Sequence, residues 1–107
     1  MREIEFGTRL GDVIAAAGGT AIDVALDIAD SKDVQRLVDR TMTEFKRVDV
    51  LLHSAGICPR QPFFEMTDED WRRVLSVNLD GSFYITRSVG RIMMAQKSGT
   101  MILLTSD

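Results

Sequence analysis

A chain of 107 residues, 45% of them hydrophobic and 27% charged, has the size and composition of a single globular domain. Its formal net charge of −3, with no run of Lys or Arg, excludes nucleic acid and anionic membrane as principal partners. The one cysteine, Cys58, excludes an intrachain disulfide and a cysteine-based metal cluster. Because His53 is the one histidine beside this cysteine, we expect no metal site. The N-terminal residues contain no apolar segment, so we expect a cytoplasmic protein with no membrane span.

The first half of the chain alternates helix and strand patterns. Residues 3–17 carry apolar side chains at helical spacing, and Gly18 and Gly19 favour a helix end there. Residues 20–26 alternate apolar and polar side chains and predict a strand. Ser31 is the predicted N-cap of the next helix. The apolar stripe expected on that helix consists of Val34, Leu37, Val38, Met42 and Phe45.

The second half continues the alternation. Residues 50–52 form a continuous apolar run, typical of a strand that is buried on both faces of a parallel sheet. Thr67 is the predicted N-cap of another helix. The buried face expected on this helix consists of Trp71, Val74, Leu75 and Leu79. A further helical pattern covers residues 82–97, and the apolar run 101–104 predicts a third strand.

This order of elements predicts an α/β fold with a parallel sheet and right-handed crossovers. Ligands of such sheets bind beyond the carboxyl ends of the strands. Topology alone therefore makes three segments candidates for a site. They are residues 27–28, residues 54–56 and residues 105–106.

An asparagine and a glycine interrupt the helical pattern in the second half. Asn78 is a poor residue inside a helix because its amide competes for backbone hydrogen bonds. Gly81 adds about 1 kcal/mol of helix penalty relative to Ala. The two together predict a kink or a tight packing site. Two interpretations of the Asn78 amide stay open, which are a hydrogen bond to a nearby carbonyl and a chemical role.

Five short segments carry a combined motif pattern. They are residues 17–21 (AGGTA), 26–30 (LDIAD), 54–56 (SAG), Trp71 with 77–81 (VNLDG), and 99–106 (GTMILLTS). In order and spacing they resemble the short-chain dehydrogenase/reductase family. The resemblance implies a Rossmann-like three-layer sandwich, incomplete here, in which three strands alternate with helices. Residues 1–107 would form a single partial domain.

The resemblance also implies a chemistry, which is hydride transfer between NAD or NADP and a small alcohol or carbonyl substrate. The cofactor-binding residues it implies are Asp27, Ile28, Ser54, Ala55 and Gly56, and the catalytic residues are Asn78 and Ser106. Asp27 would contact the adenine, Asn78 would hold a water in a proton relay, and Ser106 would polarise the substrate oxygen. A plain strand-end hydroxyl bonded to backbone is the alternative for Ser106.

The sequence departs from the family pattern at three places. The glycine-rich turn that binds a pyrophosphate is absent from these residues, and Gly18 and Gly19 follow a helix rather than precede one. No Tyr-x-x-x-Lys segment is present, because Tyr84 is followed four residues later by Ser88. His53 replaces an asparagine, and we interpret it as packed at a strand end rather than as a base. We therefore expect a fragment that is inactive alone. A catalytically dead structural or oligomerisation module is the alternative.

The resemblance places two further strands between the strands 20–26 and 50–52, and their absence leaves a gap of about 10 Å. Bare apolar strand edges invite pairing, so the strands close on each other, another polypeptide fills the gap, or the sequence is an excerpt of a longer enzyme. The helix 82–97 has more apolar surface than one sheet face needs, and the resemblance places it in a subunit interface. We expect a homo-oligomer through this helix.

Overall fold

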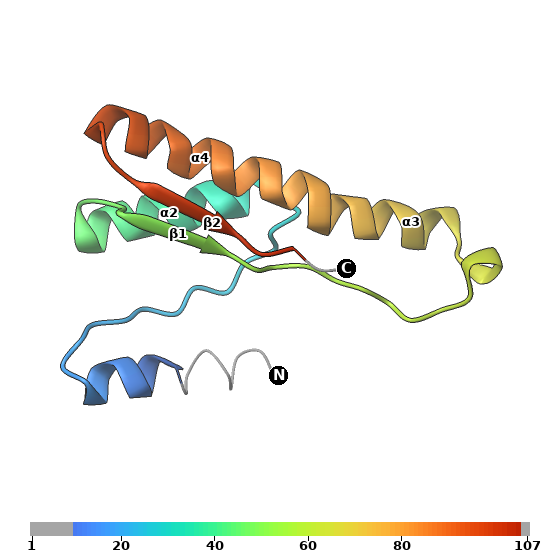
Figure 1. The fold of residues 1–107 in the computed structure, drawn as a ribbon, viewed down its shortest axis with the longest axis horizontal. Coiled ribbons are helices and arrows are strands. Elements are labelled where there is room, and N and C mark those ends of the chain that lie inside the picture. Colours follow the sequence, from blue (N-terminus) through green and yellow to red (C-terminus); the bar gives the residue numbers. More distant parts are fainter. Residues whose placement is uncertain (1–9, 106–107) are drawn as a thin grey trace.

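The computed structural model describes residues 10–105 of the chain. A helix covers residues 10–16, and the later elements are α2 (Ser31–Phe45), β1 (Val50–His53), the 3-10 helix η1 (Phe63–Glu65), α3 (Asp68–Leu75), the π-helix η2 (Ser76–Asp80), α4 (Gly81–Gln96) and β2 (Thr100–Leu103). Figure 1 shows α3, η2 and α4 as one long helical rod that lies beside the two strands. The predicted α/β class is confirmed.

The two strands form a small parallel sheet. Val50 lies opposite Thr100, and His53 lies opposite Leu103. The long helical rod connects the end of β1 to the start of β2, as parallel pairing requires. Both strands were predicted from their apolar runs, and β2 begins one residue earlier than expected.

The core lies between one face of this sheet and two helices. Leu51 of β1 and Met101 of β2 pack against it. Its buried members are Val34 and Val38 of α2, with Ile85, Val89 and Met93 of α4. Of the apolar stripe predicted for α2, Val34 and Val38 are therefore in the core, whereas Phe45 is 40% exposed.

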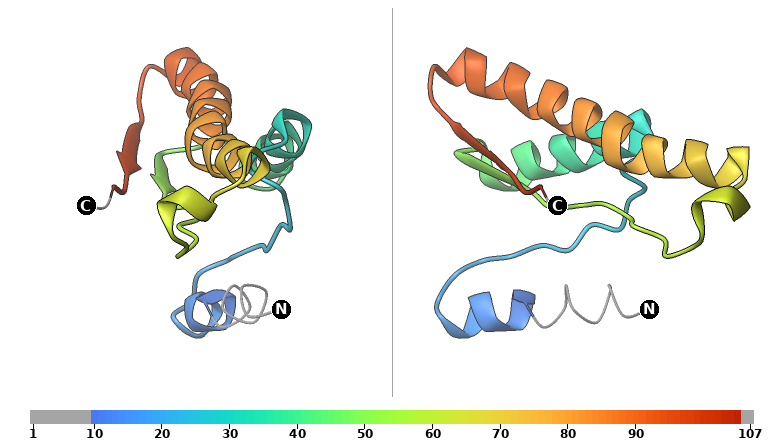
Figure 2. Two further views of the ribbon diagram at one scale, coloured as in Figure 1. Left: turned by 90° about the vertical axis from the view of Figure 1, so that its right-hand side faces the viewer. Right: turned by 45° about the vertical axis from the view of Figure 1, so that its right-hand side comes forward.

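The opposite face of the sheet is open. Val50 and Leu52 are 58% and 61% exposed, and Ile102 is 45% exposed. Figures 1 and 2 place the helix of residues 10–16 on this side of the sheet, away from α4, but it does not cover these side chains. The prediction that residues 50–52 are buried on both faces is therefore wrong for the described chain.

The predicted strand at residues 20–26 is not a strand in the structure. Ile22, Val24 and Leu26 are half-buried and their neighbours are exposed, so the expected alternation is present. No strand of the described residues lies beside this segment to complete a ladder of hydrogen bonds, because β1 pairs only with β2. Figure 1 shows it as an extended connection between the first helix and α2.

The helix starts follow local capping chemistry. The N-cap of α2 is Asp30, whose Oδ1 accepts the Lys32 N–H at 2.9 Å. The predicted cap, Ser31, is instead the first helical residue, because the carboxylate before it takes the capping position. The Thr67 cap is confirmed as part of a capping box with Asp70.

The predicted buried face of α3 is only partly correct. Val74 and Leu75 are half-buried, but Trp71 and Leu79 are 53% and 63% exposed. Figure 1 shows the reason, since α3 extends past the ends of both strands and has no sheet beneath it.

The interruption predicted at Asn78 and Gly81 is confirmed. Residues Ser76–Asp80 form the π-helix η2, a form that commonly marks functional sites. A Cβ atom on Gly81 would lie 2.9 Å from Cγ1 and 3.2 Å from the carbonyl oxygen of Ile28. The hydrogen-bonding pattern of the rod therefore changes from α-helical to π-helical next to the position where the loop at Ile28 approaches its backbone.

None of the helices in the part of the chain that the structure describes is both long and apolar enough to cross a membrane. The cytoplasmic location stays a prediction.

We expect Gly81→Ala to destabilise the chain by about 1–3 kcal/mol, because the new methyl group cannot fit against the Ile28 backbone. Gly90→Ala in the same helix is the matched control. Its Cβ would lie 3.5 Å from Met101 Cε, an ordinary contact, so the better helix propensity should stabilise by up to about 1 kcal/mol. Urea unfolding followed by circular dichroism measures both, and equal shifts would contradict the tight-packing argument.

Candidate functional site

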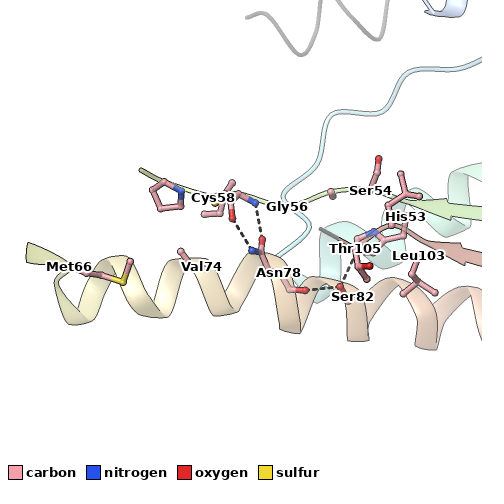
Figure 3. A pocket seen from close by; sticks show the side chains of 14 residues that line it. His53, Ser54, Gly56, Cys58, Met66, Val74, Asn78, Ser82, Leu103 and Thr105 are labelled. Atoms are coloured by element: carbon pink, nitrogen blue, oxygen red, sulfur yellow. Dashed lines mark hydrogen bonds between the residues drawn. The ribbon is translucent and has the colours of Figure 1, made fainter. Parts of the chain in front are cut away.

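Two cavities meet at the loop that follows β1, and residues 53–57 line both of them. The first cavity, of about 670 Å³, lies on the side of Asn78, Ser82 and residues 103–105 (Figure 3). The second, of about 640 Å³, lies on the side of residues 26–28. Both are at the carboxyl end of the parallel strands, where the topology predicts a site.

The second cavity brings together the predicted cofactor residues. Its lining includes Asp27, Ile28, Ser54, Ala55 and Gly56. Two segments that are 26 residues apart (54 minus 28) thus face one space, although no hydrogen-bonded strand joins them. Leu26, Leu51 and Ile57 add apolar walls, and Arg73 adds a guanidinium group. Binding by these residues stays a prediction.

The turn that carries Asp27 is held by the first turns of α2. The Asp27 N–H donates to Asp33 Oδ2 at 2.9 Å, and Asp27 Oδ1 accepts the Ala29 N–H at 2.9 Å. Arg36 donates to the Ala25 carbonyl at 2.7 Å. The hydrogen bond from the Asp27 N–H is the main reason why the pKa of Asp33 lies below its usual value, and the Arg36 cation acts in the same direction.

Asn78 clamps the loop after β1 to the helical rod. Its Oδ1 accepts the Ile57 N–H at 2.8 Å, and its Nδ2 donates to the Ile57 carbonyl at 2.8 Å (Figure 3). The approach is close, since a Cβ atom on Gly56 would lie 3.2 Å from Asn78 Oδ1. Of the two interpretations left open for this amide, the hydrogen bond to a nearby carbonyl is what the geometry contains. The proton-relay role stays a prediction.

His53, which is buried, and Ser82, which is half-buried, form a pair beside this clamp. His53 is 7% exposed and sits at the end of β1, as predicted. Its Nε2 lies 3.0 Å from Ser82 Oγ, and Ser82 Oγ donates to the Asn78 carbonyl at 2.7 Å. Sequence reasoning missed Ser82. The available signal was its spacing, because a serine four residues after Asn78 in a helix can bond back to that carbonyl.

Ser106 lies outside the described residues, so its predicted catalytic role stays a prediction. Its neighbour Thr105 lines the first cavity together with Asn78 and Cys58. The end of β2 and the π-helix thus face one space in the described structure.

The chemistry of the lining fits part of a dinucleotide. The second cavity offers apolar walls for a flat base and the Asp27 carboxylate as a hydrogen-bond acceptor. Between residues 10 and 105 no glycine-rich turn precedes a helix to bind a pyrophosphate. Within the same range no group of three His, Cys, Asp or Glu side chains is placed to hold a metal ion. The fit is therefore to the adenosine end of NAD(P) alone.

Alternating helices and parallel strands, with cavities at the carboxyl ends of the strands, define an α/β domain of the Rossmann type. Comparison with known proteins gives the particular family. The family model described as enoyl-(acyl carrier protein) reductase matches residues 5–107. The chain belongs to the short-chain dehydrogenase/reductase family.

Similar proteins are oxidoreductases of this family. The chain is 41% identical over 93 residues to a 3-oxoacyl-[acyl-carrier-protein] reductase of Synechocystis sp., covering 87% of this chain and 38% of the relative. It is 38% identical over 98 residues to an L-rhamnose 1-dehydrogenase (NAD(P)(+)) of Azotobacter vinelandii, covering 92% and 38%. The crystal structure of gox2181 matches with a TM-score of 0.85 at 32% identity, covering 92% of this chain and 39% of that one. The chain spans well under half the length of these proteins.

The Asp33 carboxylate should make stability depend on pH. Its pKa in the folded chain is below the usual 3.8, so its contribution is fully present above that value. The contribution is lost as the pH falls further, through the lower pKa of the folded state. We expect Asp33→Asn to be less stable than the parent above about pH 5, with a difference that shrinks in stronger acid.

Urea unfolding at several pH values measures this difference. Asp39→Asn on the same helix is the matched control, because it removes an equal charge without touching Asp27. A difference for Asp33→Asn that stays constant from neutral pH into strong acid would show that the Asp27 contact has no role in it.

Proposed function

We propose that the chain is the central portion of an NAD(P)-dependent oxidoreductase that transfers hydride between the nicotinamide cofactor and a small alcohol or carbonyl. The observation that carries this proposal is the second cavity, which gathers all five predicted cofactor residues at the carboxyl end of β1. The names of two relatives, a 3-oxoacyl reductase and an NAD(P)(+)-dependent dehydrogenase, support the same class of reaction.

Each site residue has a proposed task. Asp27 accepts a hydrogen bond from the adenine, and Ile28 packs beside it. Ser54, Ala55 and Gly56 form the wall on the ribose side of the same cavity.

The first cavity is the proposed place of reaction. Asn78, which lines this cavity, orders a water. Ser106, which follows Thr105 in the sequence, polarises the substrate oxygen. When bound, the nicotinamide ring supplies or accepts the hydride, while the protein residues hold the substrate oxygen and a path for the proton.

The 107 residues are proposed to be inactive by themselves. They contain neither the glycine-rich turn nor the Tyr-x-x-x-Lys segment that the family uses. Residues 26–28 and β1 line the second cavity, and among the described residues β1 pairs with β2 alone, which leaves its other edge without a partner strand. Further strands would satisfy this edge, which supports the view that a longer polypeptide contains this portion. An intact mass of the natural protein equal to that of these residues alone would contradict this view.

We expect the purified chain to catalyse neither reduction of a 3-oxoacyl thioester by NADPH nor oxidation of L-rhamnose with NAD+. Absorbance of the reduced nicotinamide measures both reactions. Titration calorimetry should still detect NADH or NADPH binding with a Kd on the order of 1 mM, because only the adenosine end finds partners. Asp27→Ala should abolish this binding.

Asp23→Ala is the matched control, since Asp23 is an exposed aspartate of the same segment that does not line the cavity. Turnover by the isolated chain would contradict its proposed inactivity. Complete absence of cofactor binding would contradict the cofactor site and favour the alternative of a structural or oligomerisation module.

The outer face of α4 is the proposed subunit interface. Phe83 is 53% exposed and Met94 is 82% exposed, and the Arg87 guanidinium lies 4.5 Å from the Phe83 ring. An aromatic side chain capped by an arginine is typical of the buried centre of an interface. We expect a dimer or larger assembly by light scattering at micromolar concentration, and a shift toward monomer in Phe83→Ser. Phe64→Ser, at a 97% exposed phenylalanine outside α4, is the control. A monomeric parent chain would count against the proposal.

A further inference from the structure

We infer that His53 and Ser82 are positioning residues, which hold Asn78 and the loop after β1 in the geometry that the reaction needs. The inference rests on the proposed function in one respect, namely that Asn78 serves the proton relay. The contacts that carry it are independent of that function. They run from the end of β1 through α4 to η2 and back to the loop at Ile57.

Counting protons fixes the direction of these hydrogen bonds. The Ser82 hydroxyl has one proton, and the Asn78 carbonyl 2.7 Å away can only accept it. The His53 Nε2 atom, 3.0 Å from the same oxygen, must then be the donor. The Nε2 atom of His53 therefore carries a proton. A hydroxyl that accepts one hydrogen bond donates the next one more strongly, so the imidazole reinforces the bond to Asn78.

This arrangement decides where the Asn78 side chain can lie. Ser82 holds the Asn78 backbone, and the Asn78 amide holds Ile57 by two hydrogen bonds of 2.8 Å. His53 is 7% exposed, so water does not readily replace its part in the network. Residues 53–57 line both cavities, so a shift of the Asn78–Ile57 hydrogen bonds would change the shape of both cavities.

A second clamp gives an internal reference within the same molecule. Gln96, near the other end of α4, accepts the Val48 N–H at 3.1 Å and donates to the Val48 carbonyl at 2.8 Å. It has the same chemistry as the Asn78 clamp but shares no contact with His53 or Ser82. Loss of overall stability would loosen both clamps, whereas loss of positioning would loosen only the one at Ile57.

Amide hydrogen exchange of the 107-residue chain, read by NMR, separates these cases. In His53→Phe and Ser82→Ala we expect exchange at Ile57 to accelerate about five- to tenfold, the effect of one lost hydrogen bond, with Val48 nearly unchanged. Ser82→Thr, which keeps the hydroxyl, should exchange at Ile57 as slowly as the parent chain. Gln96→Ala should show the reverse pattern, with fast exchange at Val48 alone.

The ring nitrogens of His53 give a second readout. A long-range proton–nitrogen spectrum should find a proton on Nε2. An Nε2 atom without a proton, or equal acceleration at Ile57 and Val48 in the two variants, would overturn the inference. Neither measurement uses a cofactor. A chain that shows this pattern but binds no NADH or NADPH would therefore refute the proposed function and leave the positioning network standing.

Discussion

Two side-chain amides fix the long helical rod to the chain on both sides of β1. Gln96 pairs with the backbone of Val48 just before the strand, and Asn78 pairs with the backbone of Ile57 after it. Each amide donates one hydrogen bond and accepts another, as a neighbouring strand would. They satisfy backbone groups in segments where the described residues offer no strand partner. The position of the loop at the carboxyl end of β1 depends on the Asn78 contact.

The family's asparagine–glycine motif acquires a physical meaning from this arrangement. Asn78 holds the loop that contains residues 54–56, and Gly81 allows Ile28 to approach the rod. These are the two segments that line the second cavity. One turn of the rod thus gathers two loops that are distant in the sequence. The π-helix η2 lies at this same turn, so the irregular backbone coincides with the convergence of the loops.

The two faces of the sheet in the described chain are packed to different extents. Helices α2 and α4 cover one face of the sheet with a tight apolar cluster, while Val50 and Leu52 stay exposed on the other face. The extended residues 20–26 keep the alternating burial of a strand without a partner. The longer polypeptide proposed above would bury both surfaces with further strands and helices.

The sequence by itself determined the order of the helices and of the strands β1 and β2, their parallel pairing, the Thr67 cap and the family, because hydrophobic period and local hydrogen-bonding chemistry act over a few residues. It also located the interruption at Asn78 and Gly81, since both residues are poor helix formers. Only the tertiary structure decided that residues 20–26 lack a ladder and that Trp71 is exposed, because both depend on what lies alongside. The contact of His53 with Ser82, 29 residues later, was likewise beyond local reasoning, since it exists only once β1 and α4 are packed together.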